Sequence, residues 1–148
     1  MPVPMATTTR LMSDVTPAQV FDVLRDGQSY ATWVVGTRAI RSVDAGWPGV
    51  DARVHYTVGY SPLRKDDVTT SQRYEPDRLL QLEAQAWPAG TARIVLTAEA
   101  VTGGSLVAIE EAPVRGMARR LHNPVFDALI KIRNVETLRR LEQQARRR

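Results

Sequence analysis

The 148-residue sequence contains no cysteine and only two histidines. Without cysteine the chain forms no disulfide bond, has no thiol nucleophile and offers no thiolate ligand to a metal. Two histidines are too few for a histidine-rich metal centre. No apolar run approaches the roughly 18 residues that cross a bilayer, and residues 1–12 lack the basic start and long apolar stretch of a secretory signal. We therefore expect a cytoplasmic protein without a metal or another cofactor.

The composition is that of an ordinary globular protein. Apolar residues make up 43% of the chain and charged residues 24%, which argues against disorder and against collagen-like sequence. A chain of this length should bury roughly 70% of its unfolded surface. We therefore expect one core and a single domain over residues 1–148.

Positive charge is concentrated at the C-terminal end. Residues 115–148 carry ten basic and three acidic side chains, whereas residues 1–114 carry ten basic and thirteen acidic ones. The basic end has no interleaved aromatic platform and no nucleic-acid-binding motif. We interpret it as a solvated helix end, where positive charge complements the helix dipole, and we expect no nucleic-acid partner.

The N-terminal part of the sequence predicts a strand followed by two short helices. Residues 7–12 are rich in β-branched side chains, as strands are. Residues 16–19 (TPAQ) form a capping-box pattern with proline at the first helical position, so a helix should begin at this proline. Gly27 is expected to end that helix in a left-handed conformation. Residues 30–35 predict a second helical piece with two aromatic rings on one face.

From residue 37 to residue 113 the apolar period changes to two, with glycine and proline turns at regular intervals. This pattern predicts six further antiparallel strands, over residues 38–43, 53–60, 64–74, 79–87, 92–101 and 105–112. Gly103 and Gly104 indicate a hairpin between the last two strands, because glycine takes positive φ at both turn positions. A helix of about 20 residues, or about 30 Å, should begin at residues 123–124 (NP).

Alternation along the strands assigns an inward face to the sheet. The apolar side chains expected there are Val54, Tyr56, Val58, Tyr60, Leu80, Leu82, Ala84, Ala86, Ala92, Ile94, Leu96, Ala98, Val107 and Ile109. The same parity places Glu111 inward, where a carboxylate must be paired, protonated or solvated. At 100° per residue, Arg133 falls near the middle of an apolar arc of the long helix, formed by residues 125, 126, 129 and 130. Small inward alanines leave space unfilled, so we expect a pocket between the sheet and this helix.

Several segments spread over the whole chain resemble one known family. They are residues 16–24 (TPAQVFDVL), 30–36 (YATWVVG), 58–63 (VGYSPL), 90–93 (GTAR), 110–113 (EEAP), 123–124 (NP) and 133–134 (RN). They resemble the START-like (SRPBCC) superfamily, specifically its polyketide cyclase/dehydrase and lipid-transport group. The resemblance implies an α+β helix-grip fold, in which a seven-stranded antiparallel sheet wraps around the long C-terminal helix. It also implies a cavity for a hydrophobic ligand between the sheet and that helix.

The resemblance and the strand alternation together indicate a set of cavity residues. We predict ligand-binding side chains at Trp33, Tyr56, Val58, Val68, Tyr74, Ala84, Ile94, Ile109, Glu111, Leu129 and Arg133. Glu111 and Arg133 are the best candidates for catalysis, because a charged pair in an apolar cavity can orient a carbonyl or a phenol or move a proton. The alternatives are a purely structural ion pair between these two residues, or a Glu111 that lies in water at the end of its strand.

Other residues also have more than one interpretation. Tyr30 and Trp33 form either a lid over the cavity, as the resemblance suggests, or a pin between the short helix and the sheet. Tyr56 and Tyr74 either point their hydroxyls into the cavity or serve as packing with one satisfied hydrogen bond. His55 and His122 are expected on the surface and in a loop rather than in acid–base roles. Asp66 lies either at the mouth of the cavity or, together with its neighbour Asp67, on the surface near a turn, and we favour the second interpretation.

Two functions fit these predictions. The first is binding of a small hydrophobic or amphipathic ligand, such as a lipid, a quinone or a polyketide-like molecule. The second is an aromatic polyketide cyclase or dehydratase that folds a poly-β-ketone in the same cavity and promotes aldol condensation or loss of water. The sequence has no compact catalytic signature such as an inward His-Asp pair, and this favours binding. Neither enzymatic turnover nor the oligomeric state follows from the residues.

Overall fold

The computed structural model describes residues 6–60, 63–85, 91–115 and 124–148. The strands are β1 (Ala6–Ser13), β2 (Thr37–Val43), β3 (Arg53–Tyr60), β4 (Leu63–Glu75), β5 (Leu79–Gln85), β6 (Thr91–Val101) and β7 (Gly104–Arg115). The helices are α1 (Pro17–Arg25), the 3-10 turn η1 (Gly27–Ser29), α2 (Tyr30–Trp33) and α3 (Pro124–Ala145). Each of the expected strands and helices is therefore present, with ends shifted by three residues at most.

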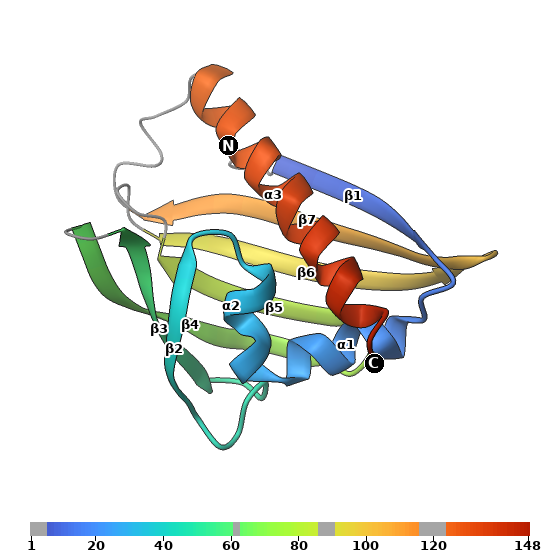
Figure 1. The fold of residues 1–148 in the computed structure, drawn as a ribbon, viewed down its shortest axis with the longest axis horizontal. Coiled ribbons are helices and arrows are strands. Elements are labelled where there is room, and N and C mark those ends of the chain that lie inside the picture. The colour runs from blue at the N-terminus through green and yellow to red at the C-terminus, as the bar shows by residue number, and fades with distance from the viewer. Residues whose placement is uncertain (1–5, 61–62, 86–90, 116–123) are drawn as a thin grey trace.

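The seven strands form one antiparallel sheet in the order β1-β7-β6-β5-β4-β3-β2. Strands β2 to β7 neighbour one another in chain order, and β1 is added beside β7. Helix α3 lies across one face of the curved sheet, and α1 and α2 lie on the same face (Figure 1). The predicted α+β fold, with a long C-terminal helix on a seven-stranded sheet, is confirmed.

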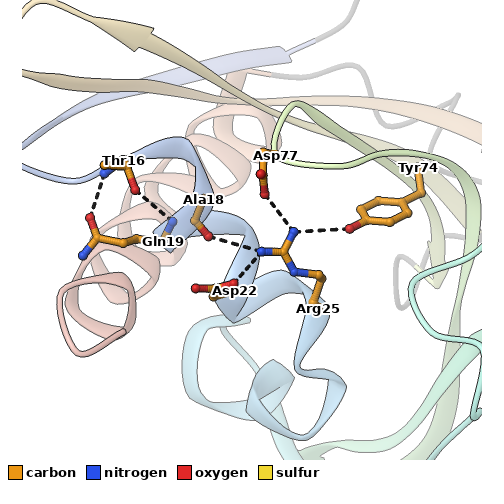
Figure 2. Close-up of polar contacts among 7 residues, drawn as sticks. All are labelled: Thr16, Ala18, Gln19, Asp22, Arg25, Tyr74 and Asp77. Atoms are coloured by element: carbon orange, nitrogen blue, oxygen red, sulfur yellow. Dashed lines mark hydrogen bonds and ion pairs between the residues drawn. The ribbon is translucent and has the colours of Figure 1, made fainter.

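Helix α1 begins where the capping pattern predicts. The backbone N–H of Gln19 donates to Thr16 Oγ1 at 3.2 Å, and the N–H of Thr16 donates to Gln19 Oε1 at 2.8 Å (Figure 2). The helix ends where Gly27 predicts, because α1 stops at Arg25 with Asp26 as its C-cap, but the expected left-handed conformation is wrong, since Gly27 has no positive φ. Glycine is required there for space instead, since a Cβ at Gly27 would lie 2.6 Å from a methyl group of Val43.

The two glycines of the β6–β7 hairpin have different roles. Gly103 takes a φ of +84°, as the turn prediction requires, but Gly104 does not have a positive φ. A Cβ at Gly104 would instead lie 2.2 Å from the carbonyl oxygen of Met12 in β1. The second glycine therefore allows β1 to approach the start of β7 closely.

Strand β4 contains a β-bulge. Ser71 pairs with Leu82 and Arg73 pairs with Gln81, so Gln72 is an extra residue between two paired positions. An extra residue reverses the alternation, because side chains on either side of it no longer share the parity of their residue numbers. The inward face of β4 therefore follows one parity before Gln72 and the other after it.

The bulge corrects the faces that uniform alternation predicts for β4. Before it, Asp67, Thr69 and Ser71 are the buried side chains, whereas Val68 lies on the outer face opposite His55. After it, Tyr74 packs against the core. The sequence-based assignment placed Val68 and Tyr74 on one inward face, and this is wrong for Val68 because a uniform period of two ignores the inserted residue.

Helix α3 buries a different face from the predicted one. The buried side chains of its described part are Asn134, Thr137, Leu138, Leu141 and Ala145. Leu129, Ile132 and Val135 are 59%, 66% and 46% exposed, and the side chains of residues 125 and 126 are outside the described part. Apolar residues lie all around this helix, so their spacing alone selects no face. Packing against β1, α1 and α2 selects it instead.

The tightly packed core lies between α1, the C-terminal half of α3 and the sheet. Its largest fully buried side chains include Met12, Phe21, Leu24, Leu80, Leu96, Leu138 and Leu141. An ion pair at the rim joins β1 to α3, because Arg10 Nε donates to Glu142 Oε1 at 2.6 Å. This end of the interior holds α3 in place, and the candidate site lies toward the other end of the same helix.

Candidate functional site

A cavity of about 110 Å³ lies between α2, the middle of α3 and strands β3, β5, β6 and β7. Eight of the predicted ligand-binding residues line it, namely Trp33, Tyr56, Val58, Ala84, Ile94, Ile109, Glu111 and Arg133. Tyr30, which the sequence offered as a possible lid, and Leu82 and Leu96, which it placed inward, also line the cavity. Sequence reasoning missed further lining residues, among them Val34, Thr37, Asn134 and Thr137. Their contact with a ligand stays a prediction.

The charged pair of the cavity joins the sheet to α3. Glu111 is 6% exposed, and its carboxylate accepts a hydrogen bond from Arg133 Nη2. Alternation along β7 explains the placement, because Val107 and Ile109 share the inward face with Glu111. Arg133 Nη2 also lies 3.4 Å from Asn134 Oδ1. The opposite charges of the pair leave this side of the cavity close to electrically neutral.

Two tyrosine hydroxyls meet one threonine beside the cavity. Thr69 Oγ1 lies 2.8 Å from the Tyr30 hydroxyl and 3.0 Å from the Tyr56 hydroxyl. The two tyrosine rings are stacked at 5.1 Å between centroids. Burial raises the pKa of both phenols, that of Tyr30 well above its ordinary value. Both therefore remain protonated at neutral pH and stabilise the wall between α2 and the sheet.

Tyr30 and Trp33 form an inner wall of the cavity. Both are only 4% exposed, and the Tyr30 ring contacts the Trp33 ring edge to face at 5.3 Å. These contacts match the packing interpretation, in which the two rings fix the short helix to the sheet. The aromatic spacing in the sequence was a sufficient signal for this shared face.

Two nitrogen donors of the cavity residues have no hydrogen-bond partner within the described part of the chain. They are Trp33 Nε1 and Asn134 Nδ2, and both residues line the cavity. Trp33 and Asn134 are 4% and 3% exposed, so bulk water does not reach them freely. Asn134 follows Arg133 directly and precedes Thr137 by three positions, so the three polar side chains lie on one face of the helix. This spacing could have predicted Asn134 and Thr137 as cavity residues.

The sequence matches a family model described as "Polyketide cyclase / dehydrase and lipid transport" over residues 5–146. The chain belongs to this family. Membership in the polyketide cyclase/dehydrase and lipid-transport family implies a cavity that binds a hydrophobic ligand, without specifying which one. No curated protein matches the sequence.

Solved structures resemble this family member over nearly its whole length. Ara h 8.0201 superposes with a TM-score of 0.75 at 14% identity, covering 99% of this chain and 100% of its own. Protein NE0264 from Nitrosomonas europaea gives a TM-score of 0.72 at 13% identity, covering 97% and 94%. DynU16, from the dynemicin biosynthetic locus, gives 0.67 at 12% identity, covering 96% of this chain and 47% of its own. At such identities the likeness shows the helix-grip fold alone.

Tyr74 is one of three predicted ligand-binding residues that do not line this cavity. Its ring lies 6.4 Å from that of Phe21, and its hydroxyl lies 3.4 Å from Arg25 Nη1. Arg25 also donates to Asp77 Oδ1 at 2.8 Å and contacts Asp22 (Figure 2). These hydrogen bonds raise the pKa of Arg25 above its ordinary value, so the guanidinium stays charged. Arg25 therefore links α1 to Tyr74 in β4 and to Asp77 in the β4–β5 turn.

The other two corrected residues follow from the fold. Val68 lies on the outer face of the sheet because of the bulge, and Leu129 is 59% exposed on the outer face of α3. His55 is an outward residue, as expected, and its Nε2 lies 3.2 Å from Asp44 Oδ1. Asp66 is exposed, also as expected. The predictions for Ala86 and His122 fall outside the described residues, as does the side chain of Tyr60.

Asp67 is a buried acid that sequence reasoning assigned to the surface. It faces inward opposite Tyr56, is 8% exposed and lies 3.8 Å from Lys65 Nζ. Burial is the main influence on its pKa and raises it above the ordinary value. Asp67 does not line the cavity.

The described ranges contain no group of three or more acidic, histidine or cysteine side chains that could hold a metal ion. Among their helices, none is long and apolar enough to cross a membrane. The polar groups of the cavity-lining residues are hydroxyl, amide, indole, carboxylate and guanidinium groups. These groups can bind and orient a ligand, and Glu111 can in addition accept a proton.

Proposed function

We propose that the protein binds a small hydrophobic or amphipathic molecule in the cavity between α3 and the sheet. The supporting observation is the division of the cavity wall. Aliphatic side chains such as Val58, Ile94 and Ile109 cover the sheet side, and polar groups gather around Arg133 and Asn134 on α3. Ligand sites generally combine a mostly apolar surface with a few polar groups that set orientation.

The volume limits how much of a ligand lies inside the cavity. At about 110 Å³, the cavity is closer to the roughly 150 Å³ that accepts benzene than to the roughly 300–1,000 Å³ of a drug-sized pocket. A whole acyl chain or a polyketide of several rings exceeds it. Among the lipid, quinone and polyketide-like ligands considered from the sequence, the proposal is therefore that one ring or the polar end of the molecule occupies this space.

Native mass spectrometry of protein purified from its own host tests this proposal. We expect a small molecule to co-purify with the natural chain and to be absent from Ala84→Phe, because the added ring fills the cavity. Thr97→Phe is the matched control, since it adds a similar ring to an adjacent strand on the outer face, between the buried Leu96 and Ala98. Equal ligand occupancy in the two variants, with native circular dichroism in both, would contradict binding at this site.

An enzymatic function is the second candidate, and Glu111 is the observation that favours it. Glu111 is the only carboxylate among the described residues that line the cavity. In a cyclase, its carboxylate would take a proton from a methylene between two ketones. The resulting enolate would form a carbon–carbon bond to another carbonyl of the chain, and the alkoxide so formed would take the proton back from Glu111 to give a hydroxyl. Glu111 would then remove the remaining proton of the same methylene, a carbon–carbon double bond would form, and the hydroxyl would leave with that proton as water. Arg133 would orient the carbonyls.

Glu111→Gln separates binding from catalysis. If the protein is a cyclase or dehydratase, the variant should lose turnover of a poly-β-ketone substrate, followed as loss of one water by mass spectrometry, while still capturing the substrate. If the protein only binds, the natural chain will show no turnover and the variant will change affinity alone. Arg133→Met is the companion variant, because it removes the orienting charge and retains the carboxylate.

A further inference from the structure

The ion pair of the cavity wall leaves polar atoms open to a ligand. Arg133 Nη2 donates to Glu111 Oε1, and the same nitrogen lies 3.4 Å from Asn134 Oδ1. Glu111 Oε2 has no hydrogen-bond partner among the described residues and retains accessible surface, although Glu111 as a whole is only 6% exposed. Arg133 Nη1 and Nε are also open, on a side chain that is 39% exposed. Both residues line the cavity.

The open oxygen of Glu111 favours a ligand that donates a hydrogen bond. A carboxylate offers roughly four acceptor sites, and the one donor that reaches Glu111 from the described side chains is Arg133. Hydrogen bonds to charged groups are stronger than neutral ones, and they gain strength where water is scarce. A ligand donor at Oε2 therefore contributes more than the same donor would at an exposed carboxylate.

The charges of the pair favour a neutral ligand. A cationic donor at Glu111 would also lie close to Arg133, because the two side chains are hydrogen-bonded to each other. A ligand carboxylate would be attracted by Arg133, but Glu111 would repel it and it has no hydrogen to donate. A hydroxyl group avoids both conflicts, since its hydrogen can bond to Glu111 Oε2 while its oxygen accepts from an open N–H of Arg133.

The remaining wall of the cavity favours an aromatic carrier for this hydroxyl. Tyr30, Trp33 and Tyr56 line the same cavity, and the Tyr30 ring contacts both of the other rings. Aromatic rings pack favourably against one another in edge-to-face and offset arrangements. The cavity volume of about 110 Å³ suits one ring rather than several.

We propose that the ligand of this cavity presents a phenolic hydroxyl, whose O–H donates to Glu111 Oε2 and whose oxygen accepts a hydrogen bond from Arg133. The phenol is either the whole ligand or the end of a larger molecule that lies inside the cavity. The inference rests on the proposed binding function and makes it specific. It concerns binding alone and requires no chemical step.

Phenol, toluene and anisole test the inference on the natural chain. Toluene replaces the hydroxyl with a methyl group, and anisole keeps the oxygen but has no O–H. We expect phenol to bind about tenfold more tightly than either of the other two, which corresponds to one net hydrogen bond. Isothermal titration calorimetry measures the three affinities.

Glu111→Gln tests the contact itself. Arg133 still requires an acceptor, so the side-chain carbonyl should take the place of Oε1 and the amide nitrogen that of Oε2. A donor then replaces the acceptor that the phenol needs, and the preference for phenol over anisole should disappear. Glu110→Gln is the matched control, because it removes the same charge from the neighbouring residue on the outer face of β7 and should keep the preference.

4-Nitrophenol gives a readout that needs no folded variant. Its ionised form is yellow, so its absorbance reports whether the bound hydroxyl keeps its proton. Binding should raise the pKa of this probe, because ionisation removes the hydrogen bond to Glu111 and places two negative charges side by side. A lowered pKa would mean that Arg133 binds a phenolate, and it would overturn the requirement for a neutral ligand.

The remaining outcomes distinguish the two levels of the proposal. Equal affinity for phenol and toluene, with both bound, would overturn the phenol inference and leave hydrophobic-ligand binding intact. An equal loss of the phenol preference in Glu111→Gln and Glu110→Gln would overturn the contact with Glu111. Absence of binding by every probe, together with absence of a co-purifying molecule, would overturn the proposed function itself.

Discussion

The two ends of the interior are built from the same elements and differ in what fills them. Toward the C-terminus of α3, Leu138 and Leu141 pack against α1 and the sheet and are at most 1% exposed. One to two turns earlier, Arg133 and Asn134 line a cavity, and so does Thr137, directly before Leu138. The backbone of α3 runs through both regions as one helix. Side-chain size and polarity therefore decide which part of this interior is solid and which part is hollow.

The strands make the same transition. On β7, Val107 belongs to the packed end and Glu111 to the cavity, with Ile109 between them. On β5, Leu80 is fully buried in the core, whereas Ala84 lines the hollow end. The packed end accordingly supplies stability, and the hollow end can vary its chemistry at lower cost in folding free energy.

The largest loss of stability is expected from a substitution in the packed end. Leu141→Ala should lower the free energy of unfolding by about 2–5 kcal/mol, because it creates a cavity in a close-packed region. Ile94→Ala beside the existing cavity should cost about 1–2 kcal/mol, since that region is already partly empty. Urea unfolding followed by circular dichroism compares the two. Equal losses would show that the two ends do not differ in packing.

The second effect concerns the charged pair of the hollow end. Arg133→Met should cost about 1–3 kcal/mol, because it leaves the buried Glu111 without its cation. The lower part of that range is expected, since the Arg133 side chain is 39% exposed and partly screened by water. Glu111→Leu combined with Arg133→Met should recover most of the loss in the same urea experiment. A double variant less stable than Arg133→Met alone would contradict this account.

A smaller effect is expected from the N-cap of α1, which belongs to the packed end. Thr16→Ala should lower the free energy of unfolding by about 1 kcal/mol, because the backbone N–H of Gln19 loses its cap. Gln143→Ala on the exposed side of α3 is the control and should change stability little. Thermal unfolding of the three proteins gives the ranking, and a control as unstable as Thr16→Ala would count against the capping argument.

The smallest expected effect depends on pH. The folded-state pKa of Asp67 is raised, so the folded protein holds its proton more tightly than the unfolded chain does. The stability that this proton contributes is present below the ordinary aspartate pKa and is lost as pH rises through the raised folded-state pKa. Asp67→Asn should therefore stabilise the protein at pH 7, and the gain should shrink in acid, where Asp67 is protonated. Urea unfolding at several pH values measures the difference, and a gain independent of pH would exclude burial of the charge as its cause.

Local signals were sufficient for most of the fold. The TPAQ pattern located the start of α1, and alternating apolar residues located β3 and the inward faces of β5, β6 and β7. Alternation also predicted that Glu111 faces inward, and the structure pairs it with Arg133. These features depend on neighbours within a few residues, which is the information that periodicity and capping patterns contain.

The features that sequence reasoning missed depend on contacts between distant segments. The bulge at Gln72 reverses which residues of β4 face inward. No sequence pattern near Gln72 predicts this extra residue. The buried face of α3 depends on packing against α1, α2 and β1, whereas its apolar residues are spread all around the helix. Asn134 was therefore overlooked as a cavity residue, and Leu129 was wrongly turned inward.

The inserted residue of β4 also has a consequence for comparing this chain with its relatives. Because of Gln72, Thr69 beside the tyrosine hydroxyls and Tyr74 beside α1 both point into the molecule, although their numbers differ in parity. In a homologue that lacks this one residue, the side chains on one side of the bulge would face the opposite side of the sheet, although the two sequences would still align there. Position-by-position transfer of site residues across this strand is reliable only between proteins that share the insertion.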